Sequence, residues 1–161
     1  MSVYFYEKVW IAISALLIVI FIGSILITSA SHLSTPPSHI ETIKPQEVMR
    51  NPQLWKPGVV PLSDGSLQVT ITARIWSFIP SRLEIPSGRK VRFRITSPDV
   101  IHGFQIIGTN INMMAVPGYI SEVATQFDLP GKYLLVCNEY CGIGHHNMSM
   151  QIEVKNEPHE R

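Results

Sequence analysis

The chain contains 161 residues, with 13 Lys and Arg against 12 Asp and Glu, and its formal net charge is +1. This length suits one domain of ordinary size with a short additional segment. The balanced charge gives no basic footprint, so the composition argues against a nucleic-acid partner. Two cysteines are too few for a disulfide-stapled miniprotein or a four-cysteine zinc site.

Residues 1–31 are predicted to form an N-terminal transmembrane anchor. No charged residue occurs between positions 9 and 30, and as a helix this stretch is roughly 33 Å long, enough to cross a hydrocarbon core of about 30 Å. A cleaved signal peptide is the alternative, but its apolar region normally spans only about 7–15 residues. The short N-terminal tail and the larger C-terminal part favour a single-pass protein with its domain on the extracytoplasmic side.

Residues 32–65 are predicted to be a linker, because they contain half of the 12 prolines. Proline fixes φ and lacks a backbone donor, so the stretch favours extended and turn conformations. We expect a semi-rigid spacer lying over the domain, with at most one helical turn near residues 45–49.

Residues 66–161 are predicted to be an all-β domain. Apolar and polar side chains alternate with a period of two in four segments, which indicates half-buried strands. The inward positions are Leu67, Val69, Ile71 and Ala73; Val91, Phe93 and Ile95; Val100, His102, Phe104 and Ile106; and Met148, Met150, Ile152 and Val154. Turn signals rich in Pro and Gly separate these segments. The pattern predicts a small antiparallel Greek-key β-sandwich or barrel, preceded by a single transmembrane α-helix. Continuing the first alternation places Ile75 inside and both Trp76 and Phe78 on the outer face.

Soft metal donors are concentrated between the last two predicted strands. Two thiols, two imidazoles and a thioether fall within residues 137–148. Thiolate and thioether favour copper over hard cations, and imidazole also suits copper. Cys141, His145 and Met148 have the spacing of a blue-copper loop, which needs one more histidine, and His102 on a predicted inward face is the candidate. A histidine satisfied within the core is the alternative for that residue.

The two cysteines admit two interpretations. A mononuclear blue site uses one cysteine, whereas Cys137 and Cys141 together can bridge two copper ions. The alternative is a Cys137–Cys141 disulfide, which is permitted outside the cytoplasm. That pairing would leave His145 and Met148 on the same loop without a purpose.

The motif Cys-x-Glu-x-Cys-Gly-x-x-His-x-x-Met with an upstream Asp-Val-Ile-His resembles the binuclear copper A domain of subunit II of haem–copper cytochrome c oxidases. Residues 95–104 and 108–112, together with the single N-terminal helix, resemble the short B-family form. The resemblance covers nearly the whole chain and implies a cupredoxin-like fold. It also implies that Cys137 and Cys141 bridge two copper ions, that His102 and Met148 complete one copper, and that His145 and the backbone carbonyl of Glu139 complete the other.

The same resemblance implies a function as the subunit that receives electrons in a proton-translocating oxidoreductase of the plasma membrane. The copper centre would accept electrons from cytochrome c or a similar donor. It would pass them to haem in the catalytic subunit I, which reduces oxygen. Trp76 is the candidate for the point at which electrons enter. In longer relatives the carboxylate matching Glu139 also binds magnesium, but for this short form we expect only its carbonyl to matter.

Two other functions fit parts of the pattern. One is an anchored or soluble copper A electron-transfer protein outside any oxidase. The other is a membrane-anchored copper chaperone of the thioredoxin-like type. The chaperone is disfavoured because its cysteines come early and open a helix, whereas Cys137 and Cys141 come late and His102 lies upstream of them.

Overall fold

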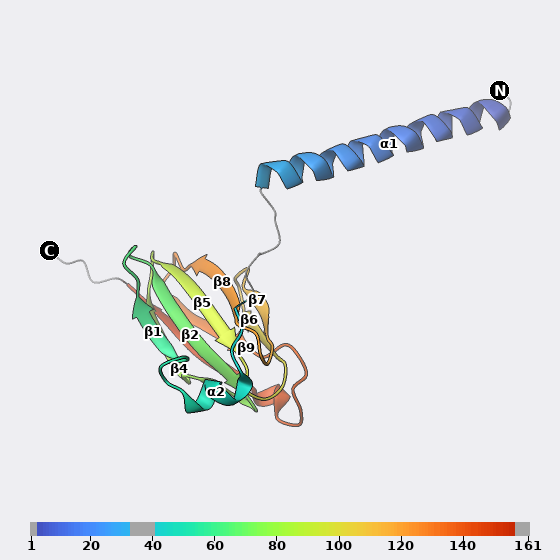
Figure 1. Ribbon diagram of the computed structural model, residues 1–161. Coiled ribbons are helices and arrows are strands. Elements are labelled where there is room, and N and C mark those ends of the chain that lie inside the picture. Colours follow the sequence, from blue (N-terminus) through green and yellow to red (C-terminus); the bar gives the residue numbers. More distant parts are fainter. Residues whose placement is uncertain (1–2, 33–40, 157–161) are drawn as a thin grey trace. The chain divides into compact units, whose positions relative to one another are not determined.

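The computed structural model describes residues 3–32 and 41–156, which fall into two separate units divided between residues 39 and 40. The first unit contains one helix, α1 (Val3–His32) (Figure 1). Between Tyr4 and Ala30 it is long and apolar enough to cross a membrane. Its apolar side chains are exposed within the chain, as lipid-facing side chains are, so the predicted apolar N-terminal helix is confirmed.

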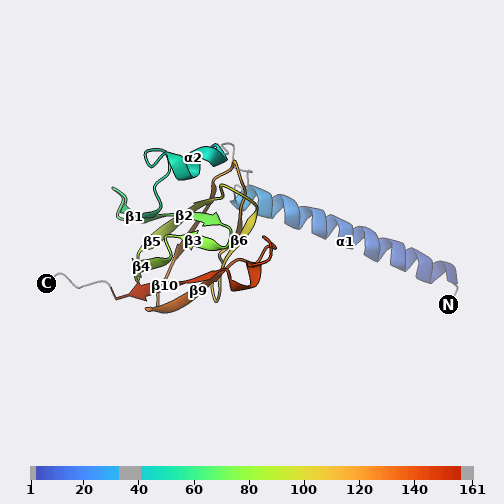
Figure 2. The same ribbon diagram turned by 90° about the horizontal axis from the view of Figure 1, so that it is seen from below.

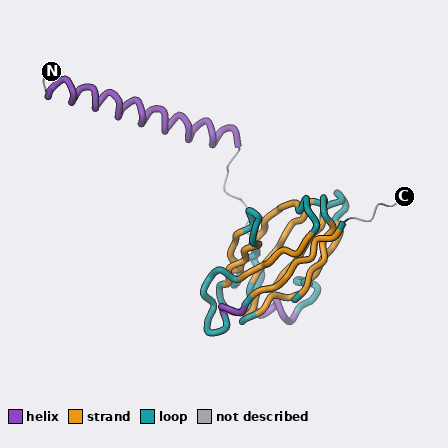
Figure 3. Tube along the Cα trace, turned by 180° about the vertical axis from the view of Figure 1, so that it is seen from behind, coloured by secondary structure: helices purple, strands orange, loops and turns teal. Residues whose placement is uncertain are grey.

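The second unit is a sandwich of two β-sheets, seen edge-on in Figure 2 and from behind in Figure 3. The first sheet contains, in spatial order, β1 (Gly58–Pro61), β2 (Leu67–Arg74), β5 (Lys90–Thr96) and β8 (Ser121–Gln126), with β3 (Ser77–Ile79) also paired to β2. The second contains β4 (Arg82–Pro86), β10 (Ser149–Lys155), β9 (Gly131–Val136), β6 (His102–Ile106) and β7 (Asn112–Ala115). The prediction of an all-β, cupredoxin-like sandwich is confirmed.

Two strand pairs differ from the expected antiparallel arrangement. Strand β2 pairs with β5 in parallel, and β4 pairs with β10 in parallel. Parallel neighbours need a connection that crosses over, and here β3 and β4 lie in the chain between β2 and β5. Alternation along a strand reports which face is buried but not the direction of its neighbour.

The core lies between the two sheets, where the alternating apolar side chains meet. Phe93 of β5 and Phe104 of β6 pack with their ring centroids 5.7 Å apart. Phe78 packs edge-on against Phe104 at 6.0 Å. Three of the predicted metal ligands, Cys137, Cys141 and Met148, belong to the same buried core. These residues, His102, His145 and the Glu139 carbonyl are called the donor cluster below. The candidate site is therefore built into one end of the hydrophobic core.

The described part of the expected linker is packed onto the domain. It contains a short helix, α2 (Pro45–Arg50), and strand β1 of the first sheet. Ile43, Val48 and Trp55 form a second small core, and the Trp55 indole donates a hydrogen bond to Thr72 Oγ1 at 2.8 Å. The prediction relied on the proline content and did not consider these apolar side chains. It therefore underestimated how much regular structure this stretch forms. Residues 33–40 of the expected linker lie outside the described residues.

The inward and outward positions predicted for Ile75 and Phe78 are wrong. Strand β2 ends at Arg74, which pairs with Ser77 of β3, so Ile75 and Trp76 form a two-residue turn. Ile75 is exposed rather than buried, and Phe78 is buried rather than exposed. The turn resets the phase of the alternation, which holds only within one continuous strand.

Candidate metal centre

The sheet topology brings the predicted donors to one end of the sandwich. His102 is the first residue of β6, Cys137 directly follows β9, and Met148 directly precedes β10. Strand β9 lies between β6 and β10 and is antiparallel to both. The starts of β6 and β10 therefore meet the end of β9. A backbone hydrogen bond of 3.0 Å from Cys137 N to Met148 O closes the base of the loop between them.

The side chains of this loop converge on Cys141. Its Sγ lies 3.7 Å from Cys137 Sγ, 3.7 Å from Met148 Sδ and 3.6 Å from His145 Nδ1. Both cysteines are free and buried, and a sulfur separation of 3.7 Å is far longer than the roughly 2.05 Å of a disulfide bond. The Cys137 thiol donates to the Glu139 carbonyl oxygen at 3.2 Å, so this oxygen also faces the cluster.

His102 joins the cluster from the other side. One of its ring nitrogens lies within 4.8 Å of both cysteine sulfurs, and all three residues are buried. Its Nε2 lies 2.8 Å from Asp99 Oδ1. A carboxylate only accepts hydrogen bonds, so Nε2 is the donor in this contact and Nδ1 is the other ring nitrogen. Within the described part of the chain, Nδ1 of His102 is the one buried side-chain nitrogen or oxygen without a hydrogen-bond partner.

These observations test whether the residues fit a metal. An orphaned buried imidazole nitrogen costs free energy unless something binds it. The His102 ring lies beside two thiols, and a second imidazole, a thioether and a carbonyl oxygen complete the donor set. Soft sulfur donors with imidazole select copper over hard cations. The donor set fits a copper centre.

Asp99 contacts the candidate ligand His102, a role that the sequence interpretation did not assign to it. Its carboxylate accepts from His102 Nε2, from the backbone N–H groups of Ile75 and Val100, and from the Ser97 hydroxyl. Burial on its own raises the pKa of Asp99, but these hydrogen bonds outweigh burial and lower the pKa below its usual value. The carboxylate is therefore ionised at neutral pH and holds His102 in one orientation. The signal was available, since Asp99 lies three residues before the predicted ligand.

Burial has the opposite effect on the Cys141 thiol. Burial first, followed by hydrogen bonding to Cys137 and repulsion from it, raises the pKa of Cys141 to about 11. Without metal the thiol stays protonated at neutral pH. Because a metal binds the thiolate, metal uptake at this position must release that proton.

Glycine allows the donor loop to approach β6. A Cβ on Gly103, the residue after His102, would lie only 2.6 Å from the backbone nitrogens of Asn138 and Glu139. The loop therefore crosses β6 in direct backbone contact. This contact brings the backbone of Glu139 next to the residue that follows His102, while the Glu139 side chain is exposed.

Two exposed aromatic side chains lie at the donor loop, Trp76 from outside it and Tyr140 within it. The Trp76 indole is partly exposed and donates from Nε1 to the Cys141 carbonyl oxygen at 3.3 Å. Tyr140 packs edge-on against the His145 imidazole, with ring centroids 5.8 Å apart. The sequence prediction that Trp76 lies at the surface is confirmed by its position, whereas nothing in the sequence distinguished Tyr140.

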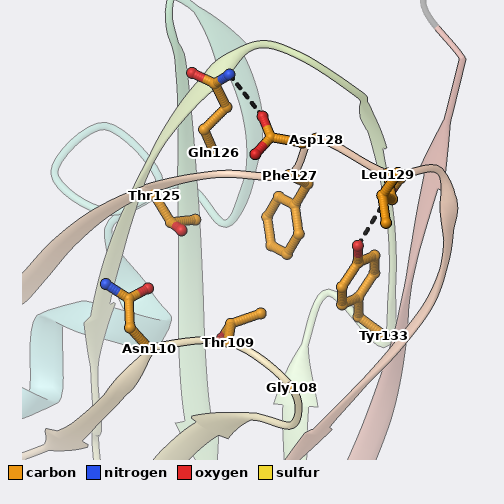
Figure 4. A pocket seen from close by; sticks show the side chains of 9 residues that line it. All are labelled: Gly108, Thr109, Asn110, Thr125, Gln126, Phe127, Asp128, Leu129 and Tyr133. Atoms are coloured by element: carbon orange, nitrogen blue, oxygen red, sulfur yellow. Dashed lines mark hydrogen bonds between the residues drawn. The ribbon is translucent and has the colours of Figure 1, made fainter.

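One cavity lies away from this cluster (Figure 4). It has a volume of about 230 Å³ and is formed where β6 and β8 end and β9 begins, at the opposite end of β6 and β9 from the donors. Figure 4 shows Gln126 bonded to Asp128 and Tyr133 bonded to the Leu129 carbonyl. The cavity contains none of the predicted site residues.

Fold and site together define a membrane-anchored, single-pass chain that carries a cupredoxin-like domain with a copper-type donor set. Residues 66–155 match the family "Cytochrome C oxidase subunit II, periplasmic domain". The chain belongs to the cytochrome c oxidase subunit II family and is therefore part of an oxidoreductase complex with other oxidase subunits.

Known relatives support this assignment over nearly the full length. A cytochrome c oxidase subunit 2 of Thermus thermophilus is 40% identical over 154 residues, covering 93% of this chain and 92% of that protein. A chain in the cryo-EM structure of a heme-copper terminal oxidase dimer is 30% identical, with a TM-score of 0.66 and coverage of 93% of this chain and 99% of that one. The periplasmic domain of subunit II from Bradyrhizobium japonicum, with 21% identity and a TM-score of 0.53 over 56% of this chain and 84% of that one, shares the fold.

Proposed function

We propose that the donor cluster holds two copper ions and that this centre receives electrons from cytochrome c or a similar donor. The electrons then pass to haem in the catalytic subunit I of the oxidase, where oxygen is reduced. The observation that carries this proposal is the convergence of two free thiols and an unpartnered imidazole nitrogen in a buried site. The membership of the chain in the subunit II family supplies the context of an oxidase.

The ligand assignment is the one that the resemblance to subunit II implies. Cys137 and Cys141 would hold both ions, His102 and Met148 would complete one of them, and His145 with the Glu139 carbonyl would complete the other. Three contacts support this assignment: Cys141 Sγ to Met148 Sδ at 3.7 Å, Cys141 Sγ to His145 Nδ1 at 3.6 Å, and Cys137 Sγ to the Glu139 oxygen at 3.2 Å. When bound, such a copper pair supplies one-electron redox chemistry shared between two metals.

The contribution of the protein is to hold the donors in place and to exclude water. Cys137, Cys141 and Met148 are buried in the core, and His102 is anchored on β6 and oriented by Asp99. Donors fixed by packing and by hydrogen bonds move little when the charge of the site changes. Small rearrangement favours fast electron transfer.

We also propose how the chain is placed in the membrane and where the electron donor docks. Residues 1–31 anchor it in the plasma membrane and residues 66–161 form the copper domain on the extracytoplasmic side, with residues 41–65 packed onto that domain. Trp76 is the candidate for the point where electrons enter, because its indole reaches the carbonyl of Cys141. Ile143 and Tyr140 on the same loop are 84% and 74% exposed and offer an apolar surface to a donor.

A copper A protein outside any oxidase is less well supported. The chain spans 92% of the length of the Thermus thermophilus subunit and aligns with a whole chain of an oxidase assembly. The copper chaperone has no support from the fold, because the cysteines lie at the end of β9 in a β-sandwich and not at the start of a helix.

Metal analysis of ligand variants tests the proposed assignment. The full chain, purified in detergent and loaded with copper, is expected to bind two copper ions per chain. Cys137→Ser and Cys141→Ser should each abolish the binuclear spectrum, whereas His146→Ala should preserve it, because His146 is exposed and its ring bonds to the neighbouring Asn147. One copper per chain in the wild type, or an unchanged spectrum in either cysteine variant, would contradict the proposal.

A further inference from the structure

The turn between β2 and β3 contacts Asp99, which orients His102, and also contacts the loop that carries Cys141. The turn itself contributes no metal ligand. Ile75 N donates to Asp99 Oδ2 at 2.8 Å, and Asp99 Oδ1 accepts from His102 Nε2 at 2.8 Å. On the other side, Trp76 Nε1 donates to the Cys141 carbonyl at 3.3 Å. Two adjacent residues therefore link the His102 segment to a loop that lies more than thirty positions further along the chain.

The loop is shaped to receive the Trp76 ring. A Cβ on Gly144 would overlap Cδ2 of the indole and would lie 2.6 Å from Cγ and 2.8 Å from Cε3. A Cβ on Gly142 would lie 3.2 Å from Nε1. The ring therefore covers the backbone at two glycines, and the absence of side chains there makes the close approach possible.

The loop needs such support more than the strands do. Between β9 and β10 its regular structure is limited to the short 3₁₀ turn η1 (His145–Asn147). Tyr140 and Ile143 project into solvent and do not pack into the core. Fixing the backbone of such a segment costs roughly 1–2 kcal/mol per residue in conformational entropy. Contacts from a rigid neighbour lower that cost before the metal arrives.

We propose that the Ile75–Trp76 turn is a strap that positions the donor loop relative to His102, with Trp76 as a positioning residue for the metal centre. This inference rests on the proposed copper function, and it adds to the proposed role of Trp76 in receiving electrons. Loss of the strap weakens metal retention and changes the spectrum of the centre, in addition to any effect on electron transfer from the electron donor.

Trp76→Ala, Gly144→Ala and the double variant form a cycle that tests the strap. Gly144 has φ −86° and ψ 5°, the conformation of the third residue of a type I turn, which most residues adopt, so its new methyl acts mainly through what it touches. In the copper-loaded full chain in detergent, each single variant is expected to release copper to a chelator about tenfold faster, which corresponds to about 1.4 kcal/mol. The double variant should release copper no faster than Trp76→Ala alone, because the methyl then has open space.

Spectra of the same variants separate positioning from a general loss of stability. Trp76→Phe keeps a ring over the glycines but lacks the N–H donor, so we expect it to fall between wild type and Trp76→Ala in copper release and in the shift of the visible absorption bands. Wild-type release rates and bands in both Trp76→Ala and Gly144→Ala would overturn the proposal. An equally large effect of Gly144→Ala in the Trp76→Ala background would also overturn it, since the methyl would then be acting elsewhere.

The metal-free chain distinguishes failure of the strap from failure of the proposed function. Absence of a binuclear copper signal in the wild type contradicts the function alone. The indole N–H resonance of Trp76, identified by its loss in Trp76→Phe, then decides about the strap. We expect Gly144→Ala to shift this resonance and speed its hydrogen exchange, and an unchanged resonance would overturn the contact.

Discussion

At the scale of single residues, the Asp99–His102 hydrogen bond decides which ring nitrogen of the imidazole is free to bind a metal. Asp99 accepts a hydrogen bond from Nε2, which leaves Nδ1 as the ring nitrogen without a hydrogen-bond partner. Partners of this kind outside the ligand set typically contribute about 10–100-fold to metal affinity.

We therefore expect Asp99→Ala to lower the copper affinity of the full chain by about 10–100-fold, measured by competition with a chelator. Asp99→Asn should lose less, because its amide oxygen still accepts from Nε2. Asp128→Ala is a matched control, since that carboxylate bonds to Gln126 at the opposite end of the sheets. Equal affinity of wild type and Asp99→Ala would contradict the orienting role.

The Cys141 thiol predicts a pH dependence of the metal-free chain. Burial raises its pKa from 9.0 to about 11, so the folded state holds this proton more tightly than the unfolded state. The resulting stabilisation is present below about pH 9 and is lost as the pH rises toward about 11. Chemical unfolding across this range should show a larger loss of stability for wild type than for Cys141→Ser, in which the other titrating groups are unchanged. If the free energy of unfolding fell equally with pH in both proteins, the Cys141 thiol would be excluded as the cause of the pH dependence.

At the scale of elements, continuous alternation was sufficient to predict four strands, β2, β5, β6 and β10, and the position of His102 on β6. It failed where a turn or a neighbouring segment intervened. The turn at Ile75 and Trp76 reversed the predicted faces of Ile75 and Phe78. The parallel pairings and the strap depend on contacts between distant segments, which no local pattern reports.

The donor set was predictable because its residue types are rare and closely spaced along one loop. The role of Asp99 and the close approaches at Gly103 and Gly144 were not predicted, since an aspartate or a glycine is common in turns for other reasons. Only the three-dimensional contacts distinguish them.

The packed segment before β2 provides a prediction at this scale. Trp55 is almost fully buried and its indole bonds to the buried hydroxyl of Thr72. Arg94 lies over the same ring, 5.6 Å from its centroid, and forms ion pairs with Glu41 and Glu122. Trp55→Ala should lower the free energy of unfolding by about 3–5 kcal/mol, and Trp55→Phe by less because it keeps a ring in the site. Wild-type stability of Trp55→Ala would show that this segment is not part of the folded domain.

At the scale of the whole molecule, the charge balance and the surface around the centre point to an apolar encounter with the donor. The chain has a formal net charge of +1. Ile143, Tyr140 and Ile101 are exposed on the loops that carry or precede the ligands. Charge steering is steeply dependent on ionic strength, whereas apolar docking is not.

Electron transfer from the donor to the intact oxidase should therefore change little with salt. Ile143→Asp should raise the KM for the donor by about tenfold, as loss of a central apolar contact does, while the copper content stays at the wild-type value. Steady-state oxidation of the donor at low and high salt measures both effects. A steep fall in rate with added salt in the wild type would contradict an apolar docking surface.

The central claim is that one electron is shared between two copper ions held by Cys137 and Cys141. Electron paramagnetic resonance of the copper-loaded full chain in detergent tests it most directly. We predict hyperfine structure from one unpaired electron interacting with two equivalent copper nuclei. A spectrum with coupling to a single copper nucleus, or no copper signal after loading, would contradict the account.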